Sequence, residues 1–199
     1  MLLDDLRLSV IEVFLGNYVG SFTGSYIARK KSLNQKTVAN TLNKLEDEGF
    51  LKSTTVGRNK EFSLNLDNLE SVKNLIVAVE HLRTANFLKK NPMVKEILLK
   101  AKLFLKGIVV VFGSYAKGTQ KKDSDLDIFV GGTYNRDKIY EISKLYGIQV
   151  NVKNYSPDAF RRVLKTKDVL INEILKNHII ITSIEEFVNM VLREYYGQD

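Results

Sequence analysis

The chain of 199 residues contains no cysteine, no tryptophan, only two prolines and only two histidines. Without cysteine, a disulfide framework and a zinc site built from thiolates are both excluded. Two prolines argue against long disordered linkers, and no apolar run approaches the roughly 20 residues that span a bilayer. The first residues, Leu3-Asp4-Asp5-Leu6, do not form a signal-peptide pattern. We therefore expect a cytoplasmic protein without a membrane contact.

The composition is that of a folded, basic protein. Hydrophobic residues make up 44% of the chain, which is enough for real cores in one large domain or two small ones. The formal net charge is +7 at pH 7, and a positive balance favours a polyanionic partner.

The most informative stretch covers residues 113–130 and lies between two predicted strands. Residues 108–112 are continuously apolar, which indicates a buried strand, and residues 126–130 follow as a second strand. Asp125 and Asp127 stand two positions apart at the start of the second strand, so their carboxylates point to the same face. Two carboxylates side by side repel each other unless a cation sits between them, and Mg²⁺ suits carboxylate and phosphate oxygens.

The turn before these carboxylates has the composition of a phosphate-binding site. Glycine at position 113 lets backbone N–H groups approach a phosphate, and a helix beginning near Ser114 would add its positive dipole end. We expect a nucleoside triphosphate and its Mg²⁺ to bind here, with the nucleotide held by Gly113, Ser114, Lys117, Gly118, Lys121 and Ser124. The alternative is a polar loop that only joins two core strands.

The string G-S-x-A-x-G-x-x-x-x-x-S-D-x-D at residues 113–127 resembles the signature of the DNA polymerase β-type nucleotidyltransferase superfamily, and in this fuller form its minimal prokaryotic branch. The pattern of strands and helices extends the resemblance over residues 92–182. The resemblance implies a small α/β domain with a mixed sheet, Mg²⁺ as cofactor, and transfer of a nucleoside monophosphate to a hydroxyl, with a protein as one candidate acceptor. Members of this branch often pair with a small helical toxin, so it also implies such a partner.

The predicted third strand departs from this family pattern. The family has a third carboxylate there, which helps to hold the catalytic metal and takes the proton from the attacking hydroxyl. Residues 148–154 contain no acid, and alternation places Gln149, Asn151 and Lys153 on one face. Asn151 is the expected occupant of the third position, and an amide cannot accept a proton at neutral pH. The predicted catalytic residues are therefore Asp125, Asp127 and Asn151, with Asp125 and Asp127 as metal ligands.

Residues 1–66 are expected to form a winged helix. Three helices are predicted over residues 6–15, 22–31 and 35–48. Either Ser32 or Asn34 caps the third helix, and two alternating strands then form a hairpin with its tip at residues 56–60. The string TVANTLNKLEDEGFLKS is similar to the recognition helix and wing of MarR-like and ArsR-like winged-helix regulators.

Double-stranded DNA is the expected partner of this winged helix. Amides and hydroxyls suit base edges, and amines suit phosphates. The predicted DNA-binding residues are Gln35, Lys36, Thr37, Asn40, Thr41 and Lys44 on the third helix and Arg58 and Lys60 at the hairpin tip. The alternative is a winged helix that docks a protein and contacts no DNA.

Residues 67–91 are expected to form a long helix that links the winged helix to a nucleotidyltransferase-like domain over residues 92–199. This helix either packs against both domains or forms a homodimer, as DNA readers with two half-sites do. His81 and His178 are interpreted as structural. The predicted class is α+β. Three functions stay open: a nucleotidyltransferase, a DNA-binding regulator that only senses a nucleotide or a partner, and a non-catalytic antitoxin-like protein.

Overall fold

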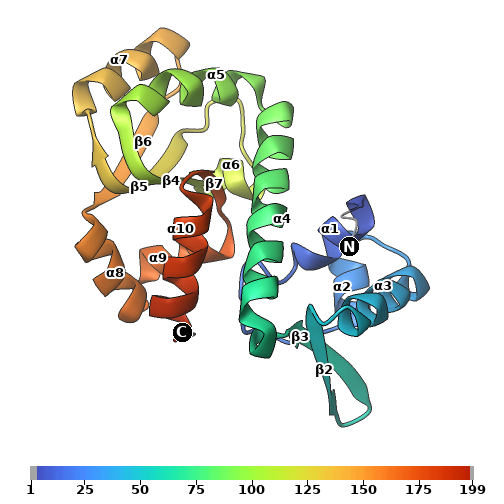
Figure 1. The fold of residues 1–199 in the computed structure, drawn as a ribbon. Helices are drawn as coiled ribbons and strands as arrows, with labels where there is room; N and C mark the ends of the chain where they lie inside the picture. Colours follow the sequence, from blue (N-terminus) through green and yellow to red (C-terminus); the bar gives the residue numbers. More distant parts are fainter. Residues whose placement is uncertain (1–3, 198–199) are drawn as a thin grey trace. The chain divides into compact units, whose positions relative to one another are not determined.

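The computed structural model describes residues 4–197, and the chain is α+β. It divides into two compact units between Val79 and Glu80 (Figure 1). This division falls inside helix α4 (Leu69–Lys90), where the sequence predicts the linking helix over residues 67–91. Within residues 4–197, none of the helices combines the length and the apolar character that crossing a bilayer would require.

Among the described residues, the N-terminal unit contains three short helices, the first part of α4 and a three-stranded antiparallel sheet. Its elements are α1 (Asp5–Ile11), β1 (Phe22–Thr23), α2 (Gly24–Lys31), α3 (Gln35–Asp47), β2 (Leu51–Val56), β3 (Asn59–Leu64) and the 3₁₀ turn η1 (Leu66–Asn68). Strand β3 lies in the middle and pairs with both β1 and β2. The hairpin is as predicted: Val56 faces Asn59, which leaves Gly57 and Arg58 as a two-residue loop.

Helix α3 begins at Asn34, one of the two predicted caps. The Asn34 side chain accepts hydrogen bonds from the backbone N–H groups of Lys36 and Thr37, which would otherwise lack a partner. Ser32 instead ends α2 in a left-handed conformation, with φ at 54°. The fully buried side chains of α3 are Val38, Leu42 and Leu45, which recur at helical spacing along one side of the helix.

Two predicted helices of this unit are too long. Helix α1 ends at Ile11 rather than Leu15, although the apolar residues beyond it are buried. Burial in irregular turns produces the same apolar pattern as a helix, so periodicity alone places the end too late. Phe22 and Thr23 belong to β1 rather than to the second helix, and the Thr23 side chain caps α2 by accepting from the N–H of Tyr26.

The C-terminal unit is built on a four-stranded mixed sheet, as the sequence predicts. Its elements are α5 (Pro92–Ala101), η2 (Lys102–Phe104), β4 (Leu105–Phe112), α6 (Gly113–Lys117), β5 (Leu126–Tyr134), α7 (Arg136–Tyr146), β6 (Val150–Tyr155), α8 (Pro157–Lys165), α9 (Val169–Lys176), β7 (Ile179–Thr182), α10 (Ile184–Met190) and the π-helical η3 (Val191–Tyr195). The strand order is β6-β5-β4-β7. Only the β5–β6 pair is parallel.

Helices cover both faces of this sheet (Figure 1). On one face, Ile97 of α5 and Ile139 of α7 join a buried cluster with Val111 and Ile128. On the other face, Phe129 of β5 packs against Phe160 of α8, with ring centroids 4.9 Å apart. Strand β4 is therefore buried on both sides, which explains its continuous apolar run.

Two consecutive glycines after residues 126–130 predict a turn, but Gly131 and Gly132 lie inside β5, opposite Ile108 and Gly107. A Cβ at Gly132 would collide with the carbonyl oxygen of Lys106. These glycines therefore allow a close approach of two strands, which sequence alone does not distinguish from a turn. The spacing of apolar residues from Pro92 to Lys106 predicts a single helix, which is too long because α5 ends at Ala101 and β4 already begins at Leu105.

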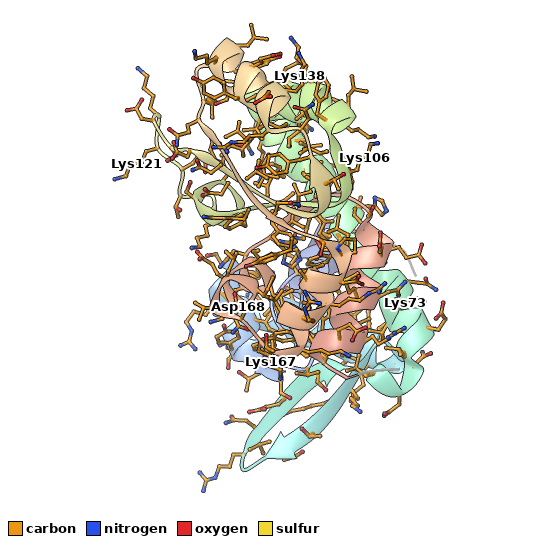
Figure 2. All side chains as sticks on the ribbon, turned by 90° about the vertical axis from the view of Figure 1, so that its left-hand side faces the viewer. Lys73, Lys106, Lys121, Lys138, Lys167 and Asp168 are labelled. Atoms are coloured by element: carbon orange, nitrogen blue, oxygen red, sulfur yellow. The ribbon has the colours of Figure 1, made fainter. Side chains whose placement is uncertain are left out.

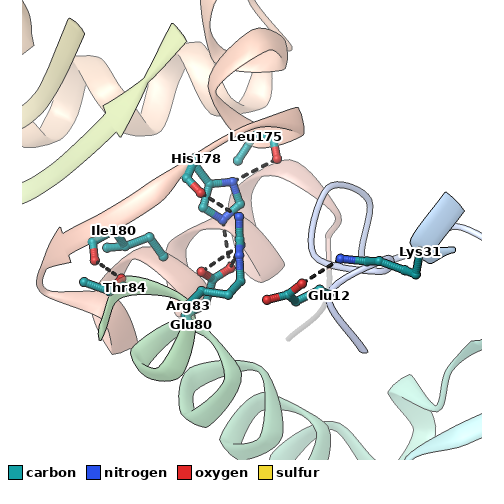
Figure 3. A network of polar contacts seen from close by, with 8 residues as sticks. All are labelled: Glu12, Lys31, Glu80, Arg83, Thr84, Leu175, His178 and Ile180. Atoms are coloured by element: carbon teal, nitrogen blue, oxygen red, sulfur yellow. Dashed lines mark hydrogen bonds and ion pairs between the residues drawn. The ribbon is translucent and has the colours of Figure 1, made fainter. Parts of the chain in front are cut away.

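His178 lies in a buried polar network with Glu80 and Arg83 (Figure 3). His178 Nε2 lies 2.8 Å from Glu80 Oε1, and His178 Nδ1 lies 2.9 Å from the carbonyl oxygen of Leu175. Burial by itself would raise the pKa of Glu80, but the charges and hydrogen bonds of His178 and Arg83 outweigh it, so this pKa lies below its usual value.

Candidate active site

Three strand ends meet at one edge of the C-terminal sheet. Strand β4 runs antiparallel to β5, and β6 runs parallel to β5, so the end of β4 lies beside the starts of β5 and β6. Phe112 faces Asp127 in the register, and Asp127 faces Asn151. The turn that begins at Gly113 is therefore adjacent to the predicted catalytic residues.

The structure brings Asp125, Asp127 and Asn151 together. Asn151 Nδ2 donates to Asp125 Oδ2 at 3.1 Å and to Asp127 Oδ1 at 3.4 Å. Gln149 Nε2 donates to Asn151 Oδ1 at 3.1 Å and so fixes the orientation of this amide. A group with partial positive charge thus lies between two half-buried carboxylates, which is where charge balance favours a cation. The catalytic roles of the three residues stay predictions.

Gly113 permits the close approach of the turn to Asp127. Its φ is +69°, and a Cβ there would collide with Asp127 Oδ2. Only glycine adopts this conformation readily and leaves that space for the carboxylate. Ser114 follows directly in α6, but this helix has five residues, so its dipole adds less than the sequence predicts.

The other predicted nucleotide-binding residues lie at the end of α6 or in the loop between α6 and β5. Lys117 Nζ pairs with Glu173 of α9 at 2.9 Å, so this ammonium group already has a partner. Gly118 ends α6 in a left-handed conformation. Ser124 Oγ accepts from the N–H of Lys121 at 2.7 Å and fastens the loop between α6 and β5. Lys121 is exposed on the outside of this loop (Figure 2).

The carboxylates fit a magnesium ion that also binds a nucleotide. Among residues 4–197, no three His, Cys, Asp or Glu side chains gather as a metal site. Mg²⁺ does not require such a cluster, because it is usually held by one or two carboxylates together with substrate phosphates. Asp125 and Asp127 are the two carboxylates at this edge of the sheet, and the Gly113 turn lies beside Asp127.

A groove of about 980 Å³ extends from Asp127 and Asn151 along β6 to α7. Its walls include Arg136, Tyr140 and Lys144, which the sequence prediction of the site missed. A signal was present: these residues recur at four-residue spacing, so on a helix such as α7 they share one face.

In the N-terminal unit, the predicted DNA-binding residues on α3 divide into two groups. The exposed ones are Gln35, Lys36, Thr37, Asn40 and Lys44. Thr41 is only 6% exposed, and its Oγ1 donates to the carbonyl oxygen of Thr37 at 3.0 Å. The prediction that Thr41 belongs to the exposed face was therefore wrong, because its threonine hydroxyl turns back to the helix backbone.

At the hairpin, Arg58 lies exposed in the two-residue loop. Lys60 Nζ instead binds Glu46 Oε2 at 2.6 Å and lies over the ring of Phe62. The hydrogen bonds from Lys60 and Ser53 lower the pKa of Glu46. Arg58 is therefore the freer of the two predicted phosphate contacts.

Comparison with known families decides the kind of domain. The family model described as polymerase beta, nucleotidyltransferase, matches residues 85–187, which is just over half of the chain. The chain belongs to the polymerase beta nucleotidyltransferase family. The matched residues of this nucleotidyltransferase domain include the Gly113 turn, both carboxylates and Asn151. A search of curated proteins finds no match.

Solved structures similar to the chain include a toxin–antitoxin structure, a chromatin protein and a viral protein. A toxin–antitoxin crystal structure with AMP-PNP has 16% identity and a TM-score of 0.34, over 53% of this chain and 83% of that one. TrmBL2, described as an archaeal chromatin protein with a novel mode of DNA binding, has 16% identity and a TM-score of 0.29, over 86% and 69%. A hypothetical protein of Pyrobaculum spherical virus, PyrSV_gp04, has 13% identity and a TM-score of 0.28, over 97% and 87%.

Proposed function

We propose that the protein binds a nucleoside triphosphate with Mg²⁺ at the edge formed by β4, β5 and β6, and slowly transfers a nucleoside monophosphate to a hydroxyl. One observation carries this proposal. Asp125 and Asp127 share the amide of Asn151, directly beside the glycine turn, inside the segment that matches the family. The paired carboxylates attract the positively charged metal, and the backbone N–H groups of the turn attract the negatively charged phosphates.

Each residue has a defined task in this proposal. Asp125 and Asp127 hold the metal, and backbone N–H groups at Gly113 and Ser114 orient the phosphates. Mg²⁺, when bound, would polarise the α-phosphate and neutralise the leaving pyrophosphate. Asn151 aligns the two carboxylates but cannot accept the proton of the attacking hydroxyl, so this proton passes to water. The lack of a positioned base lowers the rate by about 10²–10⁴.

Binding of a fluorescent ATP analogue, titrated with and without Mg²⁺, tests the site. The wild-type chain should bind the analogue only with Mg²⁺. The double variant Asp125→Asn/Asp127→Asn should lose this Mg²⁺-dependent binding. Asp123→Asn is the matched control, because Asp123 lies exposed on the same loop. Equal binding of the analogue by the double variant and the wild type would show that the nucleotide does not bind at this site.

We also propose that the N-terminal unit, up to residue 66, is a winged helix that binds double-stranded DNA. The exposed side of α3 carries amides, a hydroxyl and two lysines, and Arg58 projects from the adjoining hairpin. The stretch from Arg29 to Lys60 contains eight Lys or Arg and three Asp or Glu, so its charge favours a polyanion. A polar helix face next to a basic hairpin supports duplex binding over docking of a protein.

The change Arg58→Ala should weaken duplex binding without altering sequence preference. An arginine at a phosphate contact contributes about one unit to the slope of log affinity against log salt concentration. The slope for Arg58→Ala should therefore be smaller by about one unit. Lys52→Ala is the control, because Lys52 Nζ on the same hairpin already pairs with Asp67 at 2.9 Å. An unchanged salt slope in Arg58→Ala would exclude this hairpin from the contact.

The remaining sequence-based expectations stay predictions. They are the division into residues 1–66, 67–91 and 92–199, the homodimer, the small helical toxin-like partner, the protein acceptor and the cytoplasmic location. None of the contacts described within residues 4–197 tests any of these expectations.

A further inference from the structure

We infer that a groove at the end of the C-terminal sheet remote from the paired carboxylates docks a short acidic segment of a partner protein, and that this segment carries a bulky apolar side chain. This η2 groove has a volume of about 540 Å³, and its walls include Leu103 and Phe104 of η2, Lys106 of β4, Tyr134 of β5 and Arg136 of α7. Its size is that of a small-ligand site, so it suits a few side chains of a peptide rather than a folded domain.

The η2 groove is separate from the candidate active site. Leu105 at the start of β4 pairs with Tyr134 at the end of β5, whereas Phe112 at the other end of β4 pairs with Asp127. A strand rises about 3.4 Å per residue, so the eight residues of β4 hold the two sites about 24 Å apart. Tyr134 and Arg136 also line the groove along β6, but neither of the paired carboxylates lines the η2 groove. The inference therefore does not depend on the proposed nucleotide site.

An apolar contact point is already present at the η2 groove. Leu103 is 78% exposed, and Leu99, four residues earlier on α5, is 56% exposed. Phe104 and Tyr134 are half-buried and pack against the core cluster of the unit, so their rings are held in place. A single exposed leucine is ordinary on a protein surface. A leucine beside a hollow with two fixed rings instead forms a preorganised site that an apolar side chain of a partner would cover.

Charge at the η2 groove selects an acidic partner. Lys106 and Arg136 are both exposed, and none of the lining residues in the described part of the chain is acidic (Figure 2). Among residues 4–197 neither cation has an ion-pair partner, whereas Lys138 on the same helix α7 is paired with Glu141 at 2.8 Å. The stretch from Lys95 to Lys106 contains four lysines and one glutamate. Carboxylates of a partner would be attracted to this surface, and cations would be repelled.

Three other occupants fit these features less well. Single-stranded nucleic acid needs exposed rings on which its bases stack, whereas the most exposed apolar side chain at this groove is Leu103. A membrane surface would contact a protruding apolar face rather than the inside of a groove. In a two-fold symmetric contact, a second copy of the chain would bring its own Lys106 and Arg136 against the same cations.

Selection from a display library of random short peptides on the full chain tests the inference. The retained peptides should be enriched in Asp and Glu around a large apolar residue. A fluorescein-labelled synthetic peptide from the enriched set should bind Leu103→Ala about 10- to 100-fold more weakly than the wild type, because the change removes apolar area that the peptide buries. Leu145→Ala is the matched control, because Leu145 is 67% exposed on α7 and does not line the groove.

A charge variant gives a second readout with the same peptide. Lys106→Ala/Arg136→Ala should weaken binding about 2- to 30-fold at low salt and reduce its salt dependence, and Lys138→Ala should change neither. The substituted side chains of Leu103, Lys106 and Arg136 are exposed, so the melting temperature and the binding of the Mg²⁺–ATP analogue should stay as in the wild type.

Several outcomes would overturn the inference. They are the absence of any enriched peptide, enriched peptides without an acidic excess, and equal binding of the peptide by Leu103→Ala and the wild type. Tighter binding of a single-stranded oligonucleotide or of phosphatidylserine vesicles through the same residues would also overturn it, as would a dimer that Leu103→Ala dissociates.

Discussion

Replacing Gly113 by alanine tests whether the glycine turn and the carboxylates form one site. Position 113 has φ at +69°, and the added Cβ would collide with Asp127 Oδ2 and lie 3.2 Å from Asp127 Cγ. The change therefore acts on the backbone of the turn and on a proposed metal ligand together. It removes no functional group, so a loss of nucleotide binding reflects geometry alone.

The two effects have different magnitudes. An L-residue in the left-handed region costs about 1–2 kcal/mol, which lowers the melting temperature by roughly 2–8 °C for a chain of this size. Relief of the collision requires a shift of Asp127 on the order of 1 Å, and such a misplacement costs about 10²-fold in a positioned site. Gly113→Ala should therefore lose about 10²-fold in Mg²⁺-dependent affinity for the ATP analogue.

Gly147→Ala provides a matched control in the same unit. Its φ is +65°, and no described atom lies within 4 Å of the Cβ that the change adds. This variant should lose a similar amount of thermal stability and bind the Mg²⁺–ATP analogue as the wild type does. The reasoning is refuted if Gly113→Ala binds normally, or if both variants lose nucleotide affinity equally.

Two further predictions concern the third strand and the buried network. Asn151→Asp should raise transfer of a labelled nucleoside monophosphate by about 10²-fold, because it adds a base beside the metal; no gain would mean that another step limits the rate. Glu80→Gln should lower the free energy of unfolding by about 3–5 kcal/mol near neutral pH, because it removes the buried carboxylate that pairs with Arg83 at 2.9 Å and lies 2.8 Å from His178 Nε2. The pKa of Glu80 is lower in the folded state than the ordinary 4.5, so its contribution is present above pH 4.5 and is lost as pH falls through the folded pKa. Urea unfolding of both proteins should therefore show their difference shrinking below pH 4.5, and a difference that does not change with pH would contradict the assignment.

Local signals in the sequence were sufficient for the core of the fold. The apolar run before Gly113 and the cap at Asn34 each act through neighbours in the chain, and each is where the sequence predicts it. The placement of Asn151 beside the carboxylates also follows from alternation, once the third strand is paired with the second.

The parts that sequence did not predict depend on contacts between distant segments. Gly131 and Gly132 are strand residues because Gly107 approaches them, and no local pattern reveals that approach. The ion pair of Lys117 with Glu173 joins residues that only the fold brings together. The groove was missed for the same reason, since its walls combine one face of α7 with the open edge of β6.

A crystal structure of the chain with Mg²⁺ and a non-hydrolysable ATP analogue tests the central claim most directly. The account predicts a metal ion bound by one oxygen each of Asp125 and Asp127, with the triphosphate against the backbone of Gly113 and Ser114. A nucleotide bound elsewhere, or carboxylates that make no contact with metal or phosphate, would contradict it.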